Sequence, residues 1–154
     1  MSRRAQIVMT GEEAAAFLDR QKTVICATNG RDGYPHLMPL WFVVRDGTIW
    51  AWTYAKSQKV RNLERDPRCT LQVETGESYE QLRGLMLRCE AVIHRDPEVI
   101  GGYVAALAER YAPPGMDAAA MRDGFSRQIP KRVALEFVER GRVSWDHGKL
   151  GGTY

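Results

Sequence analysis

The alternation of apolar and polar positions changes its period several times along the chain, and each change marks an expected element. Thr10-Gly11-Glu12-Glu13 has the spacing of a capping box and predicts a short amphipathic helix to about Arg20. Period-two patterns rich in β-branched residues then predict strands over 23–28, 34–45, 48–54, 68–74 and 82–94, and a last strand or hairpin over 132–145. Further helices are expected over 57–65, 96–111 and 116–127.

Turn residues between these elements predict how the strands pair. Asp46-Gly47 separates two apolar runs and is typical of a tight β-hairpin. Strands joined by such turns pair antiparallel. Six or so antiparallel strands with few helices favour a small β-barrel with helices at its ends. The 154 residues are expected to form one domain over 1–154, with a short N-terminal helix and a glycine-rich C-terminal tail.

Both faces of the second expected strand are apolar, whereas a sheet covered on one side alternates apolar and polar positions. One face carries Leu37, Pro39, Trp41 and Val43, and the other carries Met38, Leu40, Phe42 and Val44. One face can line a barrel, and the other must be covered by a helix, a partner subunit or a flat ligand. In the third strand Trp50, Trp52 and Tyr54 share a face, which is either core or a surface on which a ring system stacks.

Charge and composition exclude some classes of function. The net charge of +3, from 22 basic and 19 acidic residues, is too small for a nucleic-acid-binding face. No apolar run approaches the ~18–20 residues that span a bilayer, and the N-terminal residues lack the apolar region of a signal peptide. We therefore expect a cytoplasmic protein that binds neither nucleic acid nor membrane. Cys26, Cys69 and Cys89 are isolated in apolar runs and are expected to be small buried residues.

No catalytic or metal-binding motif is visible. The chain has no GxGxxG, GxxxxGK[ST], HExxH, CxxC or GxSxG pattern. His36, His94 and His147 are far apart in the sequence and lack carboxylates at ligand spacing, so we expect no metal. No nucleophile–base pair stands out, and the catalytic residues stay unknown. Any reaction is therefore expected to belong to a bound cofactor.

The stretch 54–66, YAKSQKVRNLERD, places cations at the start of an expected helix. Ser57 is a favourable N-cap, with Lys56 before it and Lys59 after it. The partial positive charge of a helix N-terminus disfavours such lysines by ~0.3–1 kcal/mol. A bound phosphate reverses the sign, because backbone N–H groups and both lysines then act on one anion, with Ser57 and Thr53 as hydroxyl donors. The alternative is a solvated surface helix whose lysines point to water.

The stretch 35–74, PHLMPLWFVVRDGTIWAWTYAKSQKVRNLERDPRCTLQVE, resembles the core of the pyridoxamine 5'-phosphate oxidase-like family of FMN-binding split β-barrels. The matching features are a proline-rich strand ending in Trp-Phe, the Asp46-Gly47 hairpin, Thr53, the Ser57–Lys59 helix start and the segment from Asn62 to Arg68. The resemblance covers roughly residues 10–145. The C-terminal VSWDHGKLGG is similar to the branch of this family that uses the deazaflavin coenzyme F-420.

The resemblance implies a six-stranded antiparallel split barrel that forms a homodimer with a cofactor in each interface groove. It maps phosphate binding onto Thr53, Ser57, Gln58 and Lys59, with Lys56 adjacent. It sets the backbone around Pro39, Leu40 and Trp41 against the flavin-type ring. Trp145 and Lys149 would close the site from the partner chain. The substrate contacts of pyridoxamine 5'-phosphate oxidase itself are not recognisable in this sequence.

The function implied is that of an oxidoreductase. It would transfer hydride between F-420 and an electron-poor conjugated small molecule such as an enone, a quinone or a tetrapyrrole. An FMN-dependent oxidoreductase of the same fold is the alternative, and a non-catalytic flavin- or haem-binding protein is a third hypothesis. The oligoglutamate tail of F-420 favours cations beyond the phosphate, for which Lys56, Arg61 and Lys149 are candidates.

Overall fold

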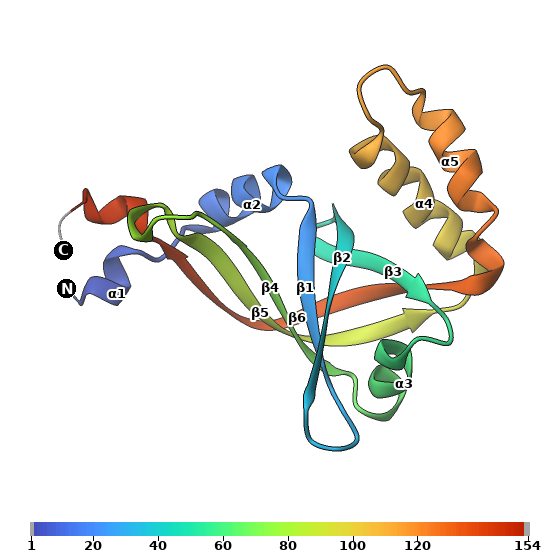
Figure 1. Ribbon diagram of the computed structural model, residues 1–154, viewed down its shortest axis with the longest axis horizontal. Coiled ribbons are helices and arrows are strands. Elements are labelled where there is room, and N and C mark those ends of the chain that lie inside the picture. Colours follow the sequence, from blue (N-terminus) through green and yellow to red (C-terminus); the bar gives the residue numbers. More distant parts are fainter. Residues whose placement is uncertain (1, 153–154) are drawn as a thin grey trace.

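The computed structural model describes residues 2–152 and is built around a closed six-stranded antiparallel barrel (Figure 1). Around the barrel the strands run in the order β1-β2-β3-β6-β5-β4. Their bounds are β1 Thr23–Asn29, β2 Pro35–Arg45, β3 Thr48–Tyr54, β4 Arg68–Thr75, β5 Arg83–His94 and β6 Arg132–Asp146. The expected fold class, a mainly β protein with a six-stranded antiparallel barrel, is confirmed. The last two residues of the expected tail lie outside the described residues.

Within residues 2–152, five α-helices flank the barrel, and their bounds are α1 Arg3–Gln6, α2 Gly11–Arg20, α3 Gln58–Arg65, α4 Pro97–Tyr111 and α5 Ala118–Ser126. Short 3-10 helices cover Tyr79–Gln81, Ile129–Lys131 and His147–Leu150. In the described part of the chain, no helix combines the length and apolarity needed to cross a membrane. The capping box is confirmed, because Thr10 accepts from the Glu13 N–H and its own N–H donates to Glu13 Oε2 at 2.7 Å.

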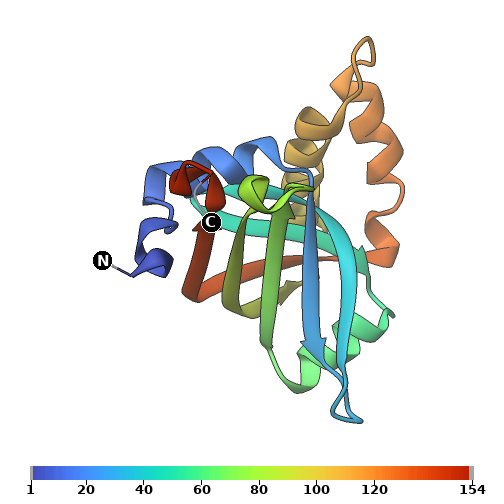
Figure 2. The ribbon, with the colours of Figure 1, turned by 60° about the vertical axis from the view of Figure 1, so that its left-hand side comes forward.

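The barrel interior is the main core, and a helix covers each of its ends. Inward-facing side chains such as Val24, Phe42 and Leu71 fill the barrel. Phe17 of α2 joins this cluster from one end, and Leu63 of α3 joins it from the other. Figure 2 shows α2 and α3 at these opposite ends. The position of α3 therefore follows from burying its apolar face against the barrel.

The α4–α5 hairpin covers part of the outside of the barrel and projects away from it (Figure 1). Trp52 of β3 is buried beneath it, with ring centroids 6.0 Å from Tyr103 and 5.6 Å from Phe125. Trp50 is half-buried and stacks on His94. Of the two interpretations of this aromatic face, packing is confirmed for Trp52.

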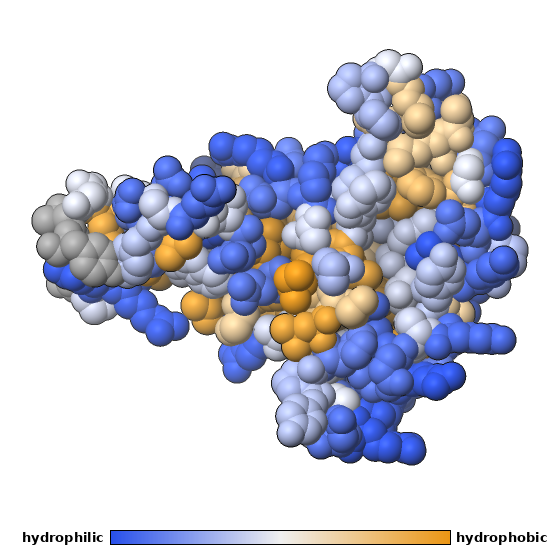
Figure 3. Space-filling view, in the orientation of Figure 1, coloured by the Kyte–Doolittle hydropathy of each residue, from blue (hydrophilic) through white to orange (hydrophobic). Residues whose placement is uncertain are grey.

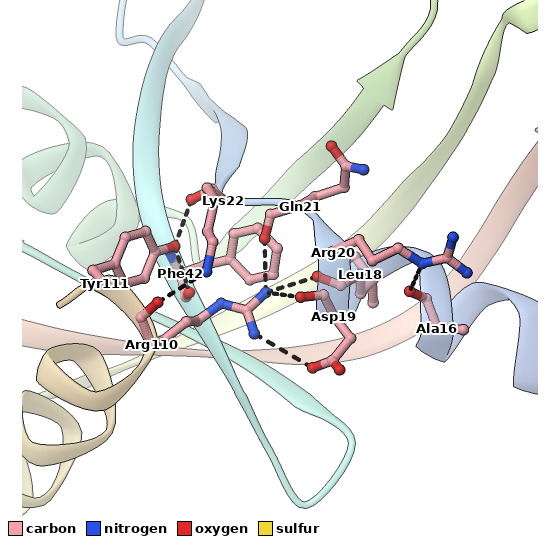
Figure 4. A network of polar contacts seen from close by, with 9 residues as sticks. All are labelled: Ala16, Leu18, Asp19, Arg20, Gln21, Lys22, Phe42, Arg110 and Tyr111. Atoms are coloured by element: carbon pink, nitrogen blue, oxygen red, sulfur yellow. Dashed lines mark hydrogen bonds and ion pairs between the residues drawn. The ribbon is translucent and has the colours of Figure 1, made fainter. Parts of the chain in front are cut away.

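Polar contacts anchor the end of α4 to the rest of the fold (Figure 4). Nη2 of Arg110 donates to the carbonyls of Leu18, Asp19 and Gln21 at 2.8, 3.2 and 2.7 Å. The hydroxyl of Tyr111 accepts from the Phe42 N–H and lies 2.7 Å from the Phe42 carbonyl oxygen. These contacts tie α4 to the end of α2 and to β2.

Part of β2 has a strand partner on one side only. Residues 35–41 pair with β1, but the ladder between β2 and β3 joins only residues 42–45 to residues 48–51. Further along, β3 pairs with β6 as far as Tyr54. The barrel is therefore open between β2 and the end of β3, near the start of α3. On this free segment Leu37 and Trp41 are 56% and 48% exposed, so much of the two-faced strand is uncovered in the protomer.

Candidate functional site

The end of β3 leads through a tight turn into α3, which brings a strand end and a helix start together. The Ser57 N–H donates to the Tyr54 carbonyl at 3.0 Å. Ser57 is the N-cap of α3, and its side chain accepts from the Val60 N–H at 3.4 Å. The first turn of α3 carries no acidic residue. Its free N–H groups therefore have no neighbouring carboxylate to satisfy them.

Lys59 is buried at this junction, with only 4% of its surface exposed. Its ammonium lies 3.3 Å from the hydroxyl of Thr53, which is its sole hydrogen bond among the described residues. Burial lowers the pKa of Lys59, and negative charge on the nearby Cys26 sulfur would oppose the shift. The interpretation of α3 as a solvated helix whose lysines point to water is therefore wrong for Lys59. Lys56 does extend to solvent.

Asn62, one turn after Gln58, is a site residue whose role sequence reasoning missed. It is fully buried, accepts from Gln58 Nε2 at 2.9 Å and donates to Thr28 Oγ1 at 3.0 Å. The sequence signal is a polar residue on the helical face that also carries Lys59 and Leu63. Asn62 links the first turn of α3 to β1.

The three residues expected beside a flavin-type ring lie on the free segment of β2. Pro39 and Trp41 are exposed, and Leu40 packs partly against the barrel core. Trp41 stacks on Tyr111 with ring centroids 4.4 Å apart and planes 16° apart. Because Tyr111 is held by Phe42, the Trp41 ring has a fixed support on one face.

Trp145 and Lys149 are not brought to this cluster within the protomer. Trp145 lies against Gly84, where an added Cβ would come within 2.4 Å of Trp145 Cζ2. The Lys149 ammonium contacts Glu13 at 2.5 Å and the Val8 carbonyl at 2.8 Å. The C-terminal segment lies at the other end of the molecule from α3 (Figure 1). A role for these two residues would therefore need a second copy of the chain.

Two grooves flank the first turn of α3. One, of about 490 Å³, lies between α3 and the β1–β2 hairpin and is lined by Gly30, Arg31, Asp32, Tyr34, Pro35, His36, Gln58 and Asn62. The other is lined by Arg31, Gln58, Arg61, Glu64 and Arg65. Figure 3 shows hydrophilic side chains over this end and a hydrophobic patch over the middle of β1 and β2. The grooves therefore join cationic surface to the edge of an apolar face.

The cysteines and histidines form no site of their own. Cys26, Cys69 and Cys89 are free and buried, as expected, and burial raises the pKa of Cys89 to about 12. Within residues 2–152, no three His, Cys, Asp or Glu side chains are grouped so as to hold a metal ion. His94 is engaged by Glu136, whose Oε2 lies 2.8 Å from its Nε2.

The barrel strands β2 and β3 pair along only part of their length, and the start of α3 lies beside the gap between them. This arrangement defines a split-barrel protein. A family model described as pyridoxamine 5'-phosphate oxidase matches residues 10–140. The chain therefore belongs to the pyridoxamine 5'-phosphate oxidase family. No protein of curated function matches it.

Solved structures share this fold. Conserved hypothetical protein Rv2991 from Mycobacterium tuberculosis is 41% identical, with a TM-score of 0.87 over all of this chain and 95% of that one. HutZ, the haem storage protein from Vibrio cholerae, is 21% identical, with a TM-score of 0.69 over 87% of this chain and 94% of that one. A protein described as F420 reductase is 24% identical, with a TM-score of 0.65 over 88% of this chain and 98% of its own. The last two show the fold alone.

Proposed function

We propose that this protein is an oxidoreductase that transfers hydride between F-420 and an electron-poor conjugated small molecule. The observation that carries the proposal is the buried ammonium of Lys59, which has one neutral hydrogen-bond partner at the N-terminus of α3. A buried charge without a counter-ion is costly. A phosphate at this helix start would supply the missing negative charge and accept from the free N–H groups.

Each residue of the site has a binding task in this proposal. Lys59, Thr53 and Ser57 hold the phosphate, and the free edge of β2 around Leu40 and Trp41 supports the ring. F-420 supplies the hydride chemistry when it is bound. The chain contributes orientation and a partly apolar surface that excludes water. We assign no proton donor.

The choice of F-420 over FMN rests on charge beyond the phosphate. FMN ends at its phosphate, whereas F-420 continues into a tail with several carboxylates. Arg31, Arg61 and Arg65 line the groove that leads away from the start of α3, and the exposed Lys56 directly precedes the N-cap of this helix. The fold-level likeness to the protein described as F420 reductase is compatible with this choice. FMN remains the alternative, because the phosphate residues serve either coenzyme.

The site is proposed to be completed in a homodimer. The exposed apolar side chains of β2 would be covered by a second copy, whose Trp145 and Lys149 would close the cofactor groove. Such an arrangement would give the two-faced strand of β2 a partner on its open side. It would also bring Trp145 and Lys149, which lie far from α3 in the protomer, to the cofactor site of the second copy.

The proposal is tested by titrating the purified protein with F-420 and FMN side by side, followed by turnover assays. F-420 is expected to bind more tightly, and its reduced form is expected to lose hydride to members of an enone, quinone and tetrapyrrole panel. Tight FMN binding without F-420 binding would leave the FMN alternative. Binding of F-420, FMN or haem without turnover on any acceptor would favour the non-catalytic hypothesis.

A further inference from the structure

A chain of hydrogen bonds runs from the surface of α3 into the barrel. Gln58 Nε2 donates to Asn62 Oδ1 at 2.9 Å, and Asn62 Nδ2 donates to Thr28 Oγ1 at 3.0 Å. Thr28 Oγ1 then donates to the carbonyl of His36 at 3.5 Å. The two inner members, Asn62 and Thr28, are buried. A side-chain amide can be turned either way in such a chain, so its direction depends on the groups at the ends.

Both ends of this chain favour the same direction. The carbonyl of His36 can only accept, so the Thr28 hydroxyl donates to it and accepts from Asn62. At the other end the guanidinium of Arg65, which can only donate, faces Asn62 Oδ1 at 3.5 Å. If the side-chain amides of Gln58 and Asn62 were turned the other way, the Thr28 hydroxyl would donate to Asn62 Oδ1 and could no longer donate to the His36 carbonyl. The Asn62 NH2 would then face the guanidinium of Arg65, which also only donates. The Gln58 NH2 is therefore held toward Asn62.

Holding the NH2 group inward leaves Gln58 Oε1 as the polar atom free for a ligand. No described residue donates to it. Gln58 lines the groove between α3 and the β1–β2 hairpin. The Nδ1 atom of His36, which lines the same groove, is buried and has no hydrogen-bond partner among residues 2–152. Polar atoms left unpaired at one groove are typical of a site that a ligand completes.

We infer that Gln58 recognises a hydrogen-bond donor, a hydroxyl or N–H group of the ligand, and does not bind the phosphate. An oxygen atom turned toward a phosphate would repel it, whereas Lys59 and Ser57 supply the donors that a phosphate needs. The inference rests on the proposed function, because it assumes a flavin-type coenzyme at this site. It makes Gln58 a residue that selects the ribityl or ring part of the coenzyme.

The test compares ligands that have or lack the phosphate. The wild-type protein and Gln58→Met are titrated with FMN and riboflavin, and with F-420 and its riboside, which lacks both phosphate and tail. Gln58 is exposed, so the variant keeps its fold; thermal melting checks this. If Gln58 accepts from the ribityl or ring part, both members of a pair lose affinity by the same factor, about 3- to 10-fold. Asp123→Asn, at an exposed position of α5 that lines neither groove, is the control and leaves affinity unchanged.

The other outcomes separate this inference from the proposed function. A loss confined to FMN or F-420, with riboflavin or the riboside unaffected, would show that Gln58 binds the phosphate and overturn the inference. No loss for any ligand would also overturn it. In Gln58→Lys, FMN is expected to weaken; tighter FMN binding would again indicate a phosphate contact. If wild-type protein binds none of the four ligands, the proposed function itself fails, and the inference falls with it.

Discussion

The ammonium of Lys59 lies 3.3 Å from the hydroxyl of Thr53, although the two residues belong to different elements. Thr53 is near the end of β3, and Lys59 is in the first turn of α3. The short connection between these elements brings the pair together, and the opening of the barrel places it beside β2. A lysine buried with one neutral partner destabilises the folded protein unless an anion joins it.

The first prediction concerns the replacement of this charge by an apolar side chain of similar length. Lys59→Met should weaken binding of F-420 or FMN by ~1.5–3 kcal/mol, the range for hydrogen bonds to charged groups. The free energy of unfolding without ligand should stay the same or rise, because an under-partnered charge is removed. Calorimetric titration and urea unfolding measure the two effects. Arg122→Met, at an exposed cation of α5, is the control, and wild-type affinity in Lys59→Met would contradict the phosphate site.

The second prediction is a pH dependence that follows from the lowered pKa of Lys59. Between the lowered pKa of Lys59 in the folded protein and the ordinary pKa of lysine, the folded protein has released a proton that the unfolded chain still holds. The free energy of unfolding of the ligand-free protein therefore rises as pH rises through this window. A bound phosphate favours the charged lysine, and above about pH 7 the phosphate charge is nearly constant. Coenzyme affinity should therefore fall as pH rises toward about 10. In Lys59→Met this fall in coenzyme affinity should disappear. A fall of equal size in the variant would show that another titrating group causes it.

The third prediction concerns Arg110, which joins α4 to the end of α2. Arg110→Met leaves the carbonyls of Leu18, Asp19 and Gln21 without their donor. It should lower the free energy of unfolding by ~1.5–3 kcal/mol, the range for bonds to a charged group. Chemical unfolding measures this loss. Arg122→Met, at an exposed position of α5, should change the free energy of unfolding little. Equal losses in both variants would show that the hydrogen bonds of Arg110 to the three carbonyls do not stabilise the fold specifically.

Local patterns were sufficient to predict the six strands and helices α2 to α5, whereas α1 was not predicted. The capping box at Thr10 starts α2 as expected, and Asp46 and Gly47 take φ values of 49° and 76°, the left-handed turn that a two-residue hairpin needs. Each of these features is encoded within a few neighbouring residues. The apolar character of both faces of β2 likewise indicated a strand that one barrel alone does not cover.

The burial of Lys59 and the role of Asn62 could not be obtained in the same way. Both depend on where α3 lies against the opening between β2 and β3, which is set by pairings distant in the sequence. The helix pattern alone left Lys59 equally able to face water. The anchoring role of Arg110 was not predictable for the same reason, because the carbonyl groups that accept its hydrogen bonds lie some 90 positions away in the sequence. Nothing in the α4 sequence identifies those carbonyls.

The fourth prediction is that the protein is a homodimer. Leu37 and Trp41 leave more apolar surface on β2 than a single barrel covers, and we expect an interface above ~2,000 Å². Light scattering should give twice the 17.4 kDa of the chain. Leu37→Glu should shift the mass to that of one chain and weaken coenzyme binding, because the groove loses its partner. Met116→Glu, at an exposed methionine outside the barrel, is the control; a monomeric wild-type protein at micromolar concentration would contradict the prediction.

The fifth prediction is the choice of F-420 over FMN. Arg31→Gln and Arg61→Gln remove cations from the groove beyond the phosphate, and each should weaken F-420 binding by ~0–1 kcal/mol while leaving FMN binding unchanged. Affinity for F-420 should also fall with rising salt, because exposed contacts to the tail are screened. Fluorescence quenching of F-420 during titration measures both effects. Arg122→Gln, far along the chain on α5, is the control for a general change in charge.

The state of the purified protein tests the same choice independently. Protein expressed in a host that lacks the deazaflavin should purify colourless, because FMN lacks the tail that the arginines attract. The same protein should then bind added F-420. Yellow protein with stoichiometric, tightly held FMN and no affinity for F-420 would instead mean that Lys59, Ser57 and Thr53 serve FMN. Arg31 and Arg61 would in that case belong to the solvated surface, since their removal would change no binding.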